Sequence, residues 1–458
     1  MPHLFIAAAH KSSGKTTLSV GLAGALTRRG TSVQTFKKGP DYIDPMWLSR
    51  ASGRPCFNLD FNTMSHDEIT NLFGAKTAVA DLGLIESNKG LFDGVDLEGS
   101  DSNAALAKLL RSPVVLVIDT TGTTRGIAPL LRGYQIFDPD IKISGVILNK
   151  VGGPRHEGKL RAAVEHYTDI PVLGAVGRNE NISVDERHLG LTTPNEIEQL
   201  ERRLSGLYDV IADSVNVDQI LKIAGDGALP AARVVSQPAP EPDVKIAIAR
   251  DSAFTYYYPD DLEALQQAGA ELVFFDALND GHMPDADGLF IGGGFPETHM
   301  QALEANKALR EDIRSKLQNG MPAYAECGGL MYLCKSLTWN GQTSAMVGAI
   351  DGDAIMCKRP QGRGYSRLKA TENHPWANLQ DNANSVPAHE FHFARIENLS
   401  AGTSFAYEVL RGQGINGKYD GIVQNNLLAG FCHMRNTAAH SWAGNFVEYV
   451  REIKFKAQ

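Results

Sequence analysis

Short apolar runs alternate with amphipathic stretches along this chain, and the alternation stops at one place. In the first half, the runs that fit buried strands are Leu4–Ala9, Leu82–Glu86, Val114–Asp119 and Ile143–Asn149. Such alternation predicts a parallel sheet with helices on both faces. The pattern stops at residues 231–243, which hold three prolines, and restarts with Val244–Ala249. The sequence therefore predicts two α/β domains, residues 1–230 and 244–458, joined by a linker at 231–243.

Composition narrows the class of protein. A chain of 458 residues is longer than a domain with a single hydrophobic core usually is. Its content of 43% apolar and 21% charged residues is typical of a globular protein. A formal charge of −9 argues against a nucleic-acid partner, because phosphate-binding surfaces are basic. No apolar run reaches the roughly 18 residues of a membrane span, so no membrane partner is predicted. The five cysteines include no C-x-x-C pair, which favours reduced, cytoplasmic thiols over disulfides or zinc.

The first predicted strand leads into a phosphate-binding pattern. The pattern G-x-x-x-x-G-K-[ST] is matched except that Ala9 replaces the first glycine, and a predicted helix, Leu18–Arg29, follows. Backbone N–H groups at such a helix N-terminus favour a polyphosphate. The residues expected to bind ATP are Ser13, Gly14, Lys15, Thr16 and Thr17. Lys15 would meet the β- and γ-phosphates and the Thr16 hydroxyl would bind Mg²⁺, whereas the alternative is an ordinary polar turn.

Two acidic clusters are candidates to complete a nucleotide site. Asp41 and Asp44 belong to a proline-containing turn, and Glu86 and Asp93 follow another predicted strand. Ligands of open α/β sheets bind at the carboxyl ends of strands, and Mg²⁺ is held by one or two carboxylates plus phosphates. Taken singly, each acidic residue is a turn former or a solvated charge. Together with a P-loop, they favour metal or acceptor binding.

Cys327 lies between a predicted strand and a Gly-Gly helix start, which is the order expected of a nucleophile elbow. A tight turn exposes the sulfur, a helix N-terminus favours the thiolate, and a backbone N–H is available for an oxyanion. The alternative is a buried structural cysteine, the common state of a lone cysteine. The cysteines without comparable surroundings are Cys56, Cys334, Cys357 and Cys432.

A thiolate nucleophile requires a base, which can be distant in sequence. His433 follows an apolar run near the C-terminus and is the strongest candidate. His389 and His392 compete with it, and the residues alone do not rank the three firmly. Gly292–Gly294 follow a strand and could supply a second oxyanion donor, because glycine lets the backbone approach a substrate closely.

Taken in order, these motifs resemble those of the cobyrinic acid a,c-diamide synthase family over the length of the chain. The N-terminal half is also similar to dethiobiotin synthetase-like P-loop enzymes, and the C-terminal half to class I glutamine amidotransferases. The motifs that carry the resemblance are the P-loop, Gly39–Pro45, Asn58–Asp60, Gly90–Gly94, Arg187–Leu191, Phe254–Pro259, Gly292–Glu297, Ala325–Tyr332 and His389–His392. The resemblance implies a dethiobiotin synthetase-like P-loop sheet followed by a flavodoxin-like glutamine amidotransferase domain.

The resemblance also implies a reaction. ATP with Mg²⁺ would phosphorylate the a- and c-acetate carboxylates of a corrin-type tetrapyrrole in turn. Ammonia released from glutamine would then attack each acyl phosphate. The expected partners are thus glutamine and a tetrapyrrole polycarboxylate, in a cytoplasmic enzyme for which a homodimer is left open.

Residue roles follow from the same resemblance. In the second half, Cys327 would be acylated by glutamine with His433 as base, and the implied oxyanion donors are Gly293 and Gly328. In the first half, Asn149 would contact adenine. The implied metal ligands are Thr16, Asp41 and Glu86. The residues implied in acceptor or intermediate binding are Asp41, Tyr42 and Asp93.

The chain departs from the family pattern at three motifs. His10-Lys11-Ser-Ser replaces a Gly/Ser-rich loop, and Glu86-Ser-Asn-Lys-Gly-Leu replaces Glu-Gly-Val-Met-Gly-Leu. His433-Met-Arg435 replaces His-Leu-His, and no acidic residue stands two positions after His433 as in the ordinary Cys-His-Glu triad. The sequence therefore leaves open which group orients His433.

Alternative functions remain beside this one. Sirohaem and nickel sirohydrochlorin carry similar acetate groups, and the changed residues after Glu86 favour a divergent member of the family. A switch ATPase of the partition or septum-site type shares the P-loop but gives no reason for Cys327. A binding module with a degenerate glutaminase half would lack the pair of Cys327 and His433.

Overall fold

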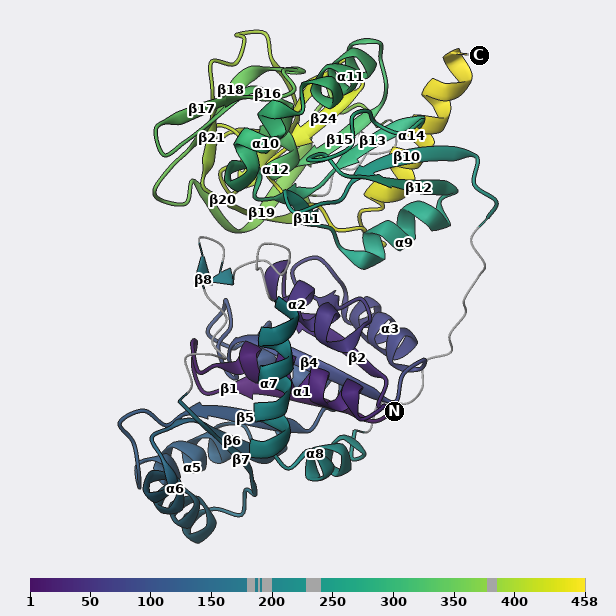
Figure 1. Ribbon diagram of the computed structural model, residues 1–458. Helices are drawn as coiled ribbons and strands as arrows, with labels where there is room; N and C mark the ends of the chain where they lie inside the picture. Colours follow the sequence, from purple (N-terminus) through teal and green to yellow (C-terminus); the bar gives the residue numbers. More distant parts are fainter. Residues whose placement is uncertain (179–185, 188–189, 192–199, 228–239, 377–384, 458) are drawn as a thin grey trace. The chain divides into compact units, whose positions relative to one another are not determined.

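The computed structural model of the chain describes residues 1–178, 186–187, 190–191, 200–227, 240–376 and 385–457 (Figure 1). The chain divides into two compact units, Met1–Ser236 and Gln237–Gln458. The predicted linker at 231–243 lies outside the described residues except for 240–243. The side chains of the motif Arg187–Leu191 also lie outside them.

The first unit contains a seven-stranded sheet in the order β3-β2-β4-β1-β5-β6-β7, and all of its neighbouring strands are parallel. Its strands are β1 (His3–Ala8), β2 (Val33–Lys38), β3 (Phe57–Leu59), β4 (Leu82–Gly90), β5 (Val114–Asp119), β6 (Ile143–Val151) and β7 (Val172–Gly177). The strands predicted from apolar runs correspond to β1, β4, β5 and β6. The prediction missed β2 because that strand ends in two lysines and is not a continuous apolar run.

Helices cover the sheet of the first unit (Figure 1). They are α1 (Lys15–Arg28), α2 (Ile43–Ser52), α3 (His66–Thr77), α4 (Asn103–Leu109), α5 (Ile127–Phe137), α6 (Pro154–Tyr167), α7 (Leu200–Ser214) and α8 (Val217–Ala224). Helix α1 packs against α2 and α7, and α5 packs against α6. Helix α1 begins at Lys15, earlier than the predicted Leu18, because Gly14 turns the chain directly into the helix with a φ of 83°.

The second unit is built on a nine-stranded sheet in the order β12-β10-β13-β15-β24-β23-β22-β19-β20. Its strands are β10 (Val244–Ala249), β12 (Ala270–Phe275), β13 (Gly288–Ile291), β15 (Ala323–Glu326), β19 (Gly362–Ala370), β20 (Val386–His392), β22 (Ser404–Arg411), β23 (Tyr419–Gln424) and β24 (Leu427–Gly430). The strands from β12 to β24 are parallel, and those from β24 to β20 are antiparallel. The parallel part matches the flavodoxin-like prediction, and the antiparallel extension adds to it.

Both faces of this sheet are covered. Ala247 and Ala249 of β10 belong to one apolar core, and the alternating residues Ile246 and Ile248 belong to another on the opposite face. The helices of the unit are α9 (Pro259–Gln267), α10 (Met300–Ala305), α11 (Lys307–Gln318), α12 (Gly328–Leu333) and α14 (Trp442–Ala457). Smaller sheets join β17 (Gln342–Ala345), β16 (Cys334–Trp339), β18 (Ile350–Met356) and β21 (Ala394–Glu397), and pair β11 (Phe254–Tyr256) with β14 (Gly293–Gly294).

Within the described part of the chain, no helix combines the length and the hydrophobicity needed to cross a lipid bilayer.

Candidate active sites of the two units

The carboxyl ends of three neighbouring strands meet in the first unit. Strands β2, β4 and β1 are adjacent and parallel, and Lys37 is paired with Glu86 in the register of β2 and β4. Strand β1 leads into the P-loop, so Lys37, Glu86 and the P-loop lie at the same edge of the sheet. Open α/β sheets bind their ligands at this edge.

Hydrogen bonds and a glycine fix the shape of the P-loop. Gly14 and Ser12 both lie in the left-handed region, with φ values of 83° and 65°. The Ser13 hydroxyl donates to the His10 carbonyl at 2.7 Å, and the Asn149 side-chain amide donates to the Ser13 carbonyl at 2.8 Å. A Cβ atom at Gly14 would lie 2.2 Å from Nδ2 of Asn149, so only glycine leaves room for this contact. Asn149 therefore braces the P-loop, and its contact with adenine stays a prediction.

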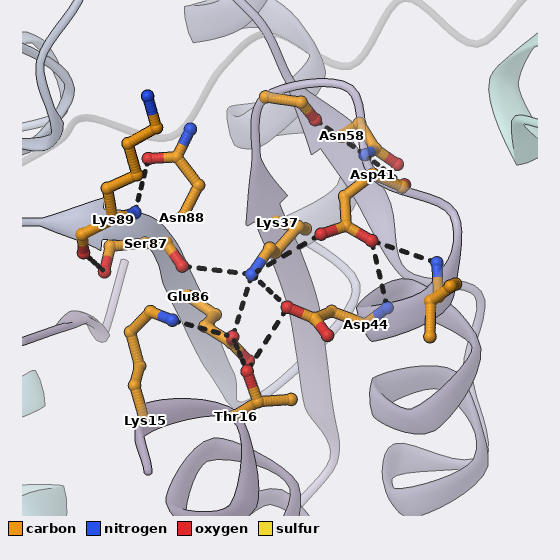
Figure 2. A network of polar contacts seen from close by, with 12 residues as sticks. Lys15, Thr16, Lys37, Asp41, Asp44, Asn58, Glu86, Ser87, Asn88 and Lys89 are labelled. Atoms are coloured by element: carbon orange, nitrogen blue, oxygen red, sulfur yellow. Dashed lines mark hydrogen bonds and ion pairs between the residues drawn. The ribbon is translucent and has the colours of Figure 1, made fainter. Parts of the chain in front are cut away.

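Beside the P-loop, charged and polar side chains, among them the buried Lys37 and Glu86, form the network shown in Figure 2. The Thr16 hydroxyl donates to Oε1 of Glu86 at 2.7 Å and lies 3.2 Å from Oδ2 of Asp44. Nζ of Lys37 lies 2.8 Å from the same Glu86 oxygen and forms an ion pair with Asp44. Nζ of Lys15 lies 3.4 Å from Glu86. One Glu86 oxygen is thus shared by a hydroxyl group and two ammonium groups.

Ion pairing determines the charge of this network. Burial by itself lowers the pKa of Lys37, but the Asp44 and Glu86 carboxylates outweigh burial and hold that pKa above its ordinary value. Burial also opposes ionisation of Asp44, yet the ammonium groups of Lys37 and Lys15 lower its pKa. Lys15 has a lowered pKa because burial and the neighbouring Lys37 both disfavour a second cation. Lys37 is therefore the cation that compensates the charges of the buried Glu86 and the partly buried Asp44 carboxylates.

The oxygen donors of the network fit a magnesium ion that is shared with nucleotide phosphates. Thr16, Asp44 and Glu86 present hydroxyl and carboxylate oxygens, which Mg²⁺ prefers as ligands. Oε2 of Glu86 is buried and makes no hydrogen bond to any residue that the structure describes. Within the same residues, no group of three or more His, Cys, Asp or Glu side chains could hold a metal by itself. A cation bound here would need phosphate oxygens as further ligands, as Mg²⁺ does in nucleotide sites.

Asp41 belongs to the metal-ligand set predicted from the sequence, but the structure brings Asp44 to Thr16 instead. Oδ1 of Asp41 accepts hydrogen bonds from the backbone amides of Ile43 at 2.9 Å and Asp44 at 3.1 Å, which fixes the start of α2. Its Oδ2 lies 3.9 Å from Nζ of Lys37. Burial and the neighbouring Asp44 carboxylate raise the pKa of Asp41 to about 6. The geometry therefore favours Asp44 over Asp41 as a metal ligand.

The remaining predicted residues of the first unit lie around this network. Thr17 is half-buried in the first turn of α1, and Tyr42 is half-buried directly before α2. Asp93 is exposed in the turn after β4, where its Oδ2 accepts a hydrogen bond from the Gly90 amide at 2.9 Å. Their roles in ATP, acceptor or intermediate binding stay predictions.

Three neighbouring parallel strands also converge in the second unit, in the order β13-β15-β24. Gly293, Cys327 and His433 follow the carboxyl ends of these three strands. Glu326 is paired with Gly430 in the register of β15 and β24, so both strands end at the same level. Residues that are more than a hundred positions apart in the sequence meet at this edge because the strands that carry them are neighbours.

The backbone at Cys327 has the strained geometry of a nucleophile elbow. Its φ of 48° and ψ of −100° fall in a region that non-glycine residues rarely adopt. The Cys327 amide donates to the Gly430 carbonyl at 2.8 Å, and its carbonyl accepts from the Met331 amide at 3.1 Å. These bonds on both sides hold the turn, so that the chain passes from β15 into α12 at this single residue.

His433 lies against the elbow. Burial disfavours a charged imidazole, but hydrogen bonds to the Cys327 thiol and to Glu326 raise the pKa of His433 to about 10. A Cβ atom at Gly293 would lie 2.8 Å from Cε1 of His433, and one at Gly328 would lie 2.9 Å from the Gly294 nitrogen. The structure thus brings Cys327, His433, Gly293 and Gly328 together. Their roles as nucleophile, base and oxyanion donors stay predictions.

The structure separates the three candidate histidines. His389 stacks on His433, with ring centroids 4.9 Å apart and an angle of 19° between the rings. Burial and the charge of His433 keep the pKa of His389 well below its usual range. The ring of His392 stacks on Phe431 at 3.9 Å, and its Nδ1 contacts the Ala394 carbonyl at 2.7 Å. Of the three, His433 is the one that meets the thiol.

Comparisons with known proteins cover both halves of the chain. The family model of the CobQ/CobB/MinD/ParA nucleotide binding domain matches residues 4–191, and that of the CobB/CobQ-like glutamine amidotransferase domain matches residues 245–439. A cobyrinate a,c-diamide synthase from Magnetococcus marinus is 44% identical over 99% of this chain and 98% of its own. Those from Archaeoglobus fulgidus and Methanosarcina acetivorans are 40% and 39% identical, each over 99% of this chain and over 98% and 96% of their own.

The chain belongs to the cobyrinate a,c-diamide synthase family. Membership of this family makes it a glutamine-dependent carbon–nitrogen ligase with a nucleotide-binding domain, which confirms the predicted family, enzyme class and two-domain α/β fold. Among solved structures, PurLQS from Thermotoga maritima aligns with 47% of this chain and 100% of its own, at 14% identity and a TM-score of 0.37.

Two residues that the structure brings into these clusters in this cobyrinate a,c-diamide synthase family member, Lys37 and Glu326, received no role from the sequence. Asp44 was assigned to an acidic cluster expected to bind metal or acceptor, but not to the metal-ligand set that the resemblance implies. Signals for them existed, because Lys37 belongs to the Gly39–Pro45 region and Glu326 directly precedes the nucleophile. The strand order that brings these residues to their partners is a property of the fold.

Proposed function

We propose that the chain amidates the a- and c-acetate carboxylates of cobyrinate, with ATP as the activating substrate and glutamine as the nitrogen donor. The observation that carries this proposal is the 44% identity to a cobyrinate a,c-diamide synthase over nearly the full length of both chains. The P-loop network and the Cys327–His433 pair supply the two chemistries that such a reaction needs.

In the first unit, a carboxylate oxygen of the acceptor attacks the γ-phosphorus of ATP, which gives an acyl phosphate and ADP. Lys15 and the P-loop amides bind the β- and γ-phosphates. Thr16, Asp44 and Glu86 would hold Mg²⁺, which neutralises phosphate charge when it is bound. Lys37 lies among these oxygens and is placed to stabilise the negative charge of the transferring phosphoryl group.

In the second unit, the Cys327 thiolate attacks the carboxamide carbon of glutamine. The backbone amides of Gly293 and Gly328 would stabilise the oxyanion, and protonated His433 donates a proton to the departing ammonia. The resulting thioester is hydrolysed by water, which His433 deprotonates, and glutamate leaves. Ammonia then attacks the carbonyl carbon of the acyl phosphate, and phosphate departs as the amide forms.

The test is mass spectrometry of three acceptors, namely cobyrinate, sirohaem and nickel sirohydrochlorin, each incubated with the chain, ATP, Mg²⁺ and glutamine. We expect cobyrinate to gain two amides in an ATP-dependent manner. If sirohaem or nickel sirohydrochlorin is amidated and cobyrinate is not, the proposed acceptor is wrong and the proposed amidation reaction stands. ATP hydrolysis without amidation of any acceptor would favour the switch ATPase, which leaves the Cys327–His433 pair unexplained.

A further inference from the structure

We propose that Glu326, the residue directly before the nucleophile, is the positioning residue that orients His433 for glutamine hydrolysis. The inference rests on the proposed glutaminase role of Cys327 and His433, and it adds a third member to that pair. In the ordinary triad, the carboxylate stands two residues after the histidine. In this chain, that position is occupied by Arg435.

Arg435 is committed to a different partner. Its side chain is 2% exposed, and its Nε and Nη2 atoms donate to Oδ2 of Asp260 at 3.0 Å and 2.7 Å. The guanidinium group also lies 4.2 Å from the ring centre of Tyr258. Guanidinium has no acceptor atom, so it cannot receive the ring N–H of a histidine. The usual position of the orienting carboxylate therefore cannot serve that role here.

The carboxylate of Glu326 is fixed by donors other than His433. The Tyr324 hydroxyl donates to Oε1 at 2.6 Å, and the Met434 backbone amide donates to the same oxygen at 2.9 Å. Oε2 lies 3.2 Å from Nδ1 of His433. Because the donors Tyr324 and Met434 hold Oε1, Oε2 is the oxygen left to face Nδ1, and it selects the orientation and the tautomer of the ring.

The backbone explains how two consecutive residues contact the same ring. Side chains alternate along β15, so Tyr324 and Glu326 share one face of the sheet. A continued strand would send residue 327 to the opposite face, but the positive φ of Cys327 redirects its side chain towards His433. With Nδ1 facing Glu326, Nε2 is the ring nitrogen that remains for the thiol. The strained elbow thus aligns carboxylate, imidazole and thiol.

The other titratable groups around this pair have different roles. His389 contacts the face of the His433 ring, and a face contact does not select between the two ring nitrogens. Burial raises the pKa of Asp261, whose carboxylate accepts from the Trp442 indole at 3.2 Å. Burial also raises the pKa of Tyr324, which keeps it a neutral donor to Glu326.

The experiment compares Glu326→Gln with Glu390→Gln in the full-length chain. Glu390 is a matched control, because it is also a buried carboxylate of the second unit, 2% exposed, and accepts from the Gln413 and Gly414 amides at 2.6 Å and 2.9 Å. For each variant, kcat and KM of glutamine hydrolysis are measured as a function of pH. Ammonia-dependent amidation and the midpoint of thermal unfolding are measured in parallel.

We expect Glu326→Gln to lower kcat for glutamine hydrolysis about 10²-fold and to change KM by less than about twofold, because an amide at this position favours the wrong tautomer. The alkaline limb of the pH profile should move to lower pH, since loss of a carboxylate lowers the pKa of His433 from about 10. Ammonia-dependent amidation should remain unchanged. Glu390→Gln should lower the unfolding midpoint without moving the alkaline limb.

Wild-type kcat and an unmoved alkaline limb in folded Glu326→Gln would overturn the proposal, and so would the same kinetic change in Glu390→Gln. If Glu326→Gln does not fold, Tyr324→Phe decides, because it removes one of the donors that fix Oε1. A fall in kcat at constant KM supports the proposal, and wild-type kinetics overturn it. Glutamine hydrolysis that persists in Cys327→Ala would instead contradict the proposed function, whatever the result for Glu326.

Discussion

The two units both collect polar and ionisable side chains at the carboxyl ends of parallel strands, but the groups proposed to act on glutamine are already in contact with one another in the second unit. There, thiol, imidazole and carboxylate come from Cys327, His433 and Glu326, which are already in contact. In the first unit, the Lys37 ammonium contacts the Asp44 and Glu86 carboxylates, and the Thr16 hydroxyl donates to Glu86. The proposed reaction there still needs ATP and an acceptor to complete the site.

This difference follows from the two chemistries. Covalent catalysis by a thiolate needs a fixed nucleophile and a fixed base, and the strained backbone of Cys327 suits the nucleophile role proposed for it. Phosphoryl transfer depends on positioning and on charge, so its residues serve as ligands for groups that arrive with the substrates. Under the proposed function, we therefore expect ammonia from solution to bypass a defect in the second unit but not one in the first.

The largest effect is expected from Lys37→Met, which removes the cation between Asp44 and Glu86. Amidation should fall about 10³-fold with glutamine and equally with ammonia, because both routes need the acyl phosphate. Amide formation is measured by mass spectrometry, together with the midpoint of thermal unfolding. Lys108→Met, which removes a lysine with a 42% exposed side chain, is the control and should retain activity with both donors. A loss of glutamine-dependent amidation without a loss of ammonia-dependent amidation would show that Lys37 does not act in the step that both nitrogen donors share.

Cys327→Ala should be almost as severe with glutamine as donor, lowering amidation about 10³-fold because no thioester can form. Amidation at high ammonia concentration should stay within about twofold of the wild type. Cys357→Ala is the matched control, since Cys357 is a partly exposed free thiol outside the site. Equal losses with both nitrogen donors would show that the units do not divide the work as described.

His433→Ala should follow the same selective pattern with an effect of about 10²-fold, which is typical of a positioned acid–base group. His392→Ala tests the assignment, because His392 contacts the Ala394 carbonyl and Phe431 rather than the thiol. Its glutamine-dependent rate should stay within a few-fold of the wild type. A larger loss of the glutamine-dependent rate in His392→Ala than in His433→Ala would show that His433 is not the base.

The smallest effect in this series concerns the metal ligands. Asp44→Asn should raise the Mg²⁺ concentration for half-maximal activity about tenfold, because Asp44 contacts Thr16 and Asp41 does not. Asp41→Asn should raise it less, since Oδ1 of Asp41 is engaged at the start of α2. The titration is run with ammonia as donor, so that the second unit does not contribute. If Asp41→Asn raises this Mg²⁺ concentration more than Asp44→Asn does, Asp41 is the metal ligand, as predicted from the sequence.

Prediction from the sequence worked where the signal is local. Apolar runs located β1, β4, β5 and β6. The helix predicted after the Gly14-Lys15 pattern began at Leu18, three residues after the observed start of α1 at Lys15. The turn at Cys327 was located because a strand, a cysteine and a Gly-Gly helix start are consecutive in the chain, and the role of Cys327 as nucleophile stays a prediction. The antiparallel strands β19 to β23 gave no comparable signal, since their pairing depends on segments that are distant in sequence.

The sequence by itself determined the two α/β units and located the P-loop and the cysteine turn at Cys327, because each depends on neighbouring residues. Only the tertiary structure decided which groups act on them. Lys37 meets Glu86 across 49 positions, and Glu326 meets His433 across 107. These contacts exist because β2 lies beside β4 and β15 lies beside β24, and strand order is set by the packing of the whole sheet.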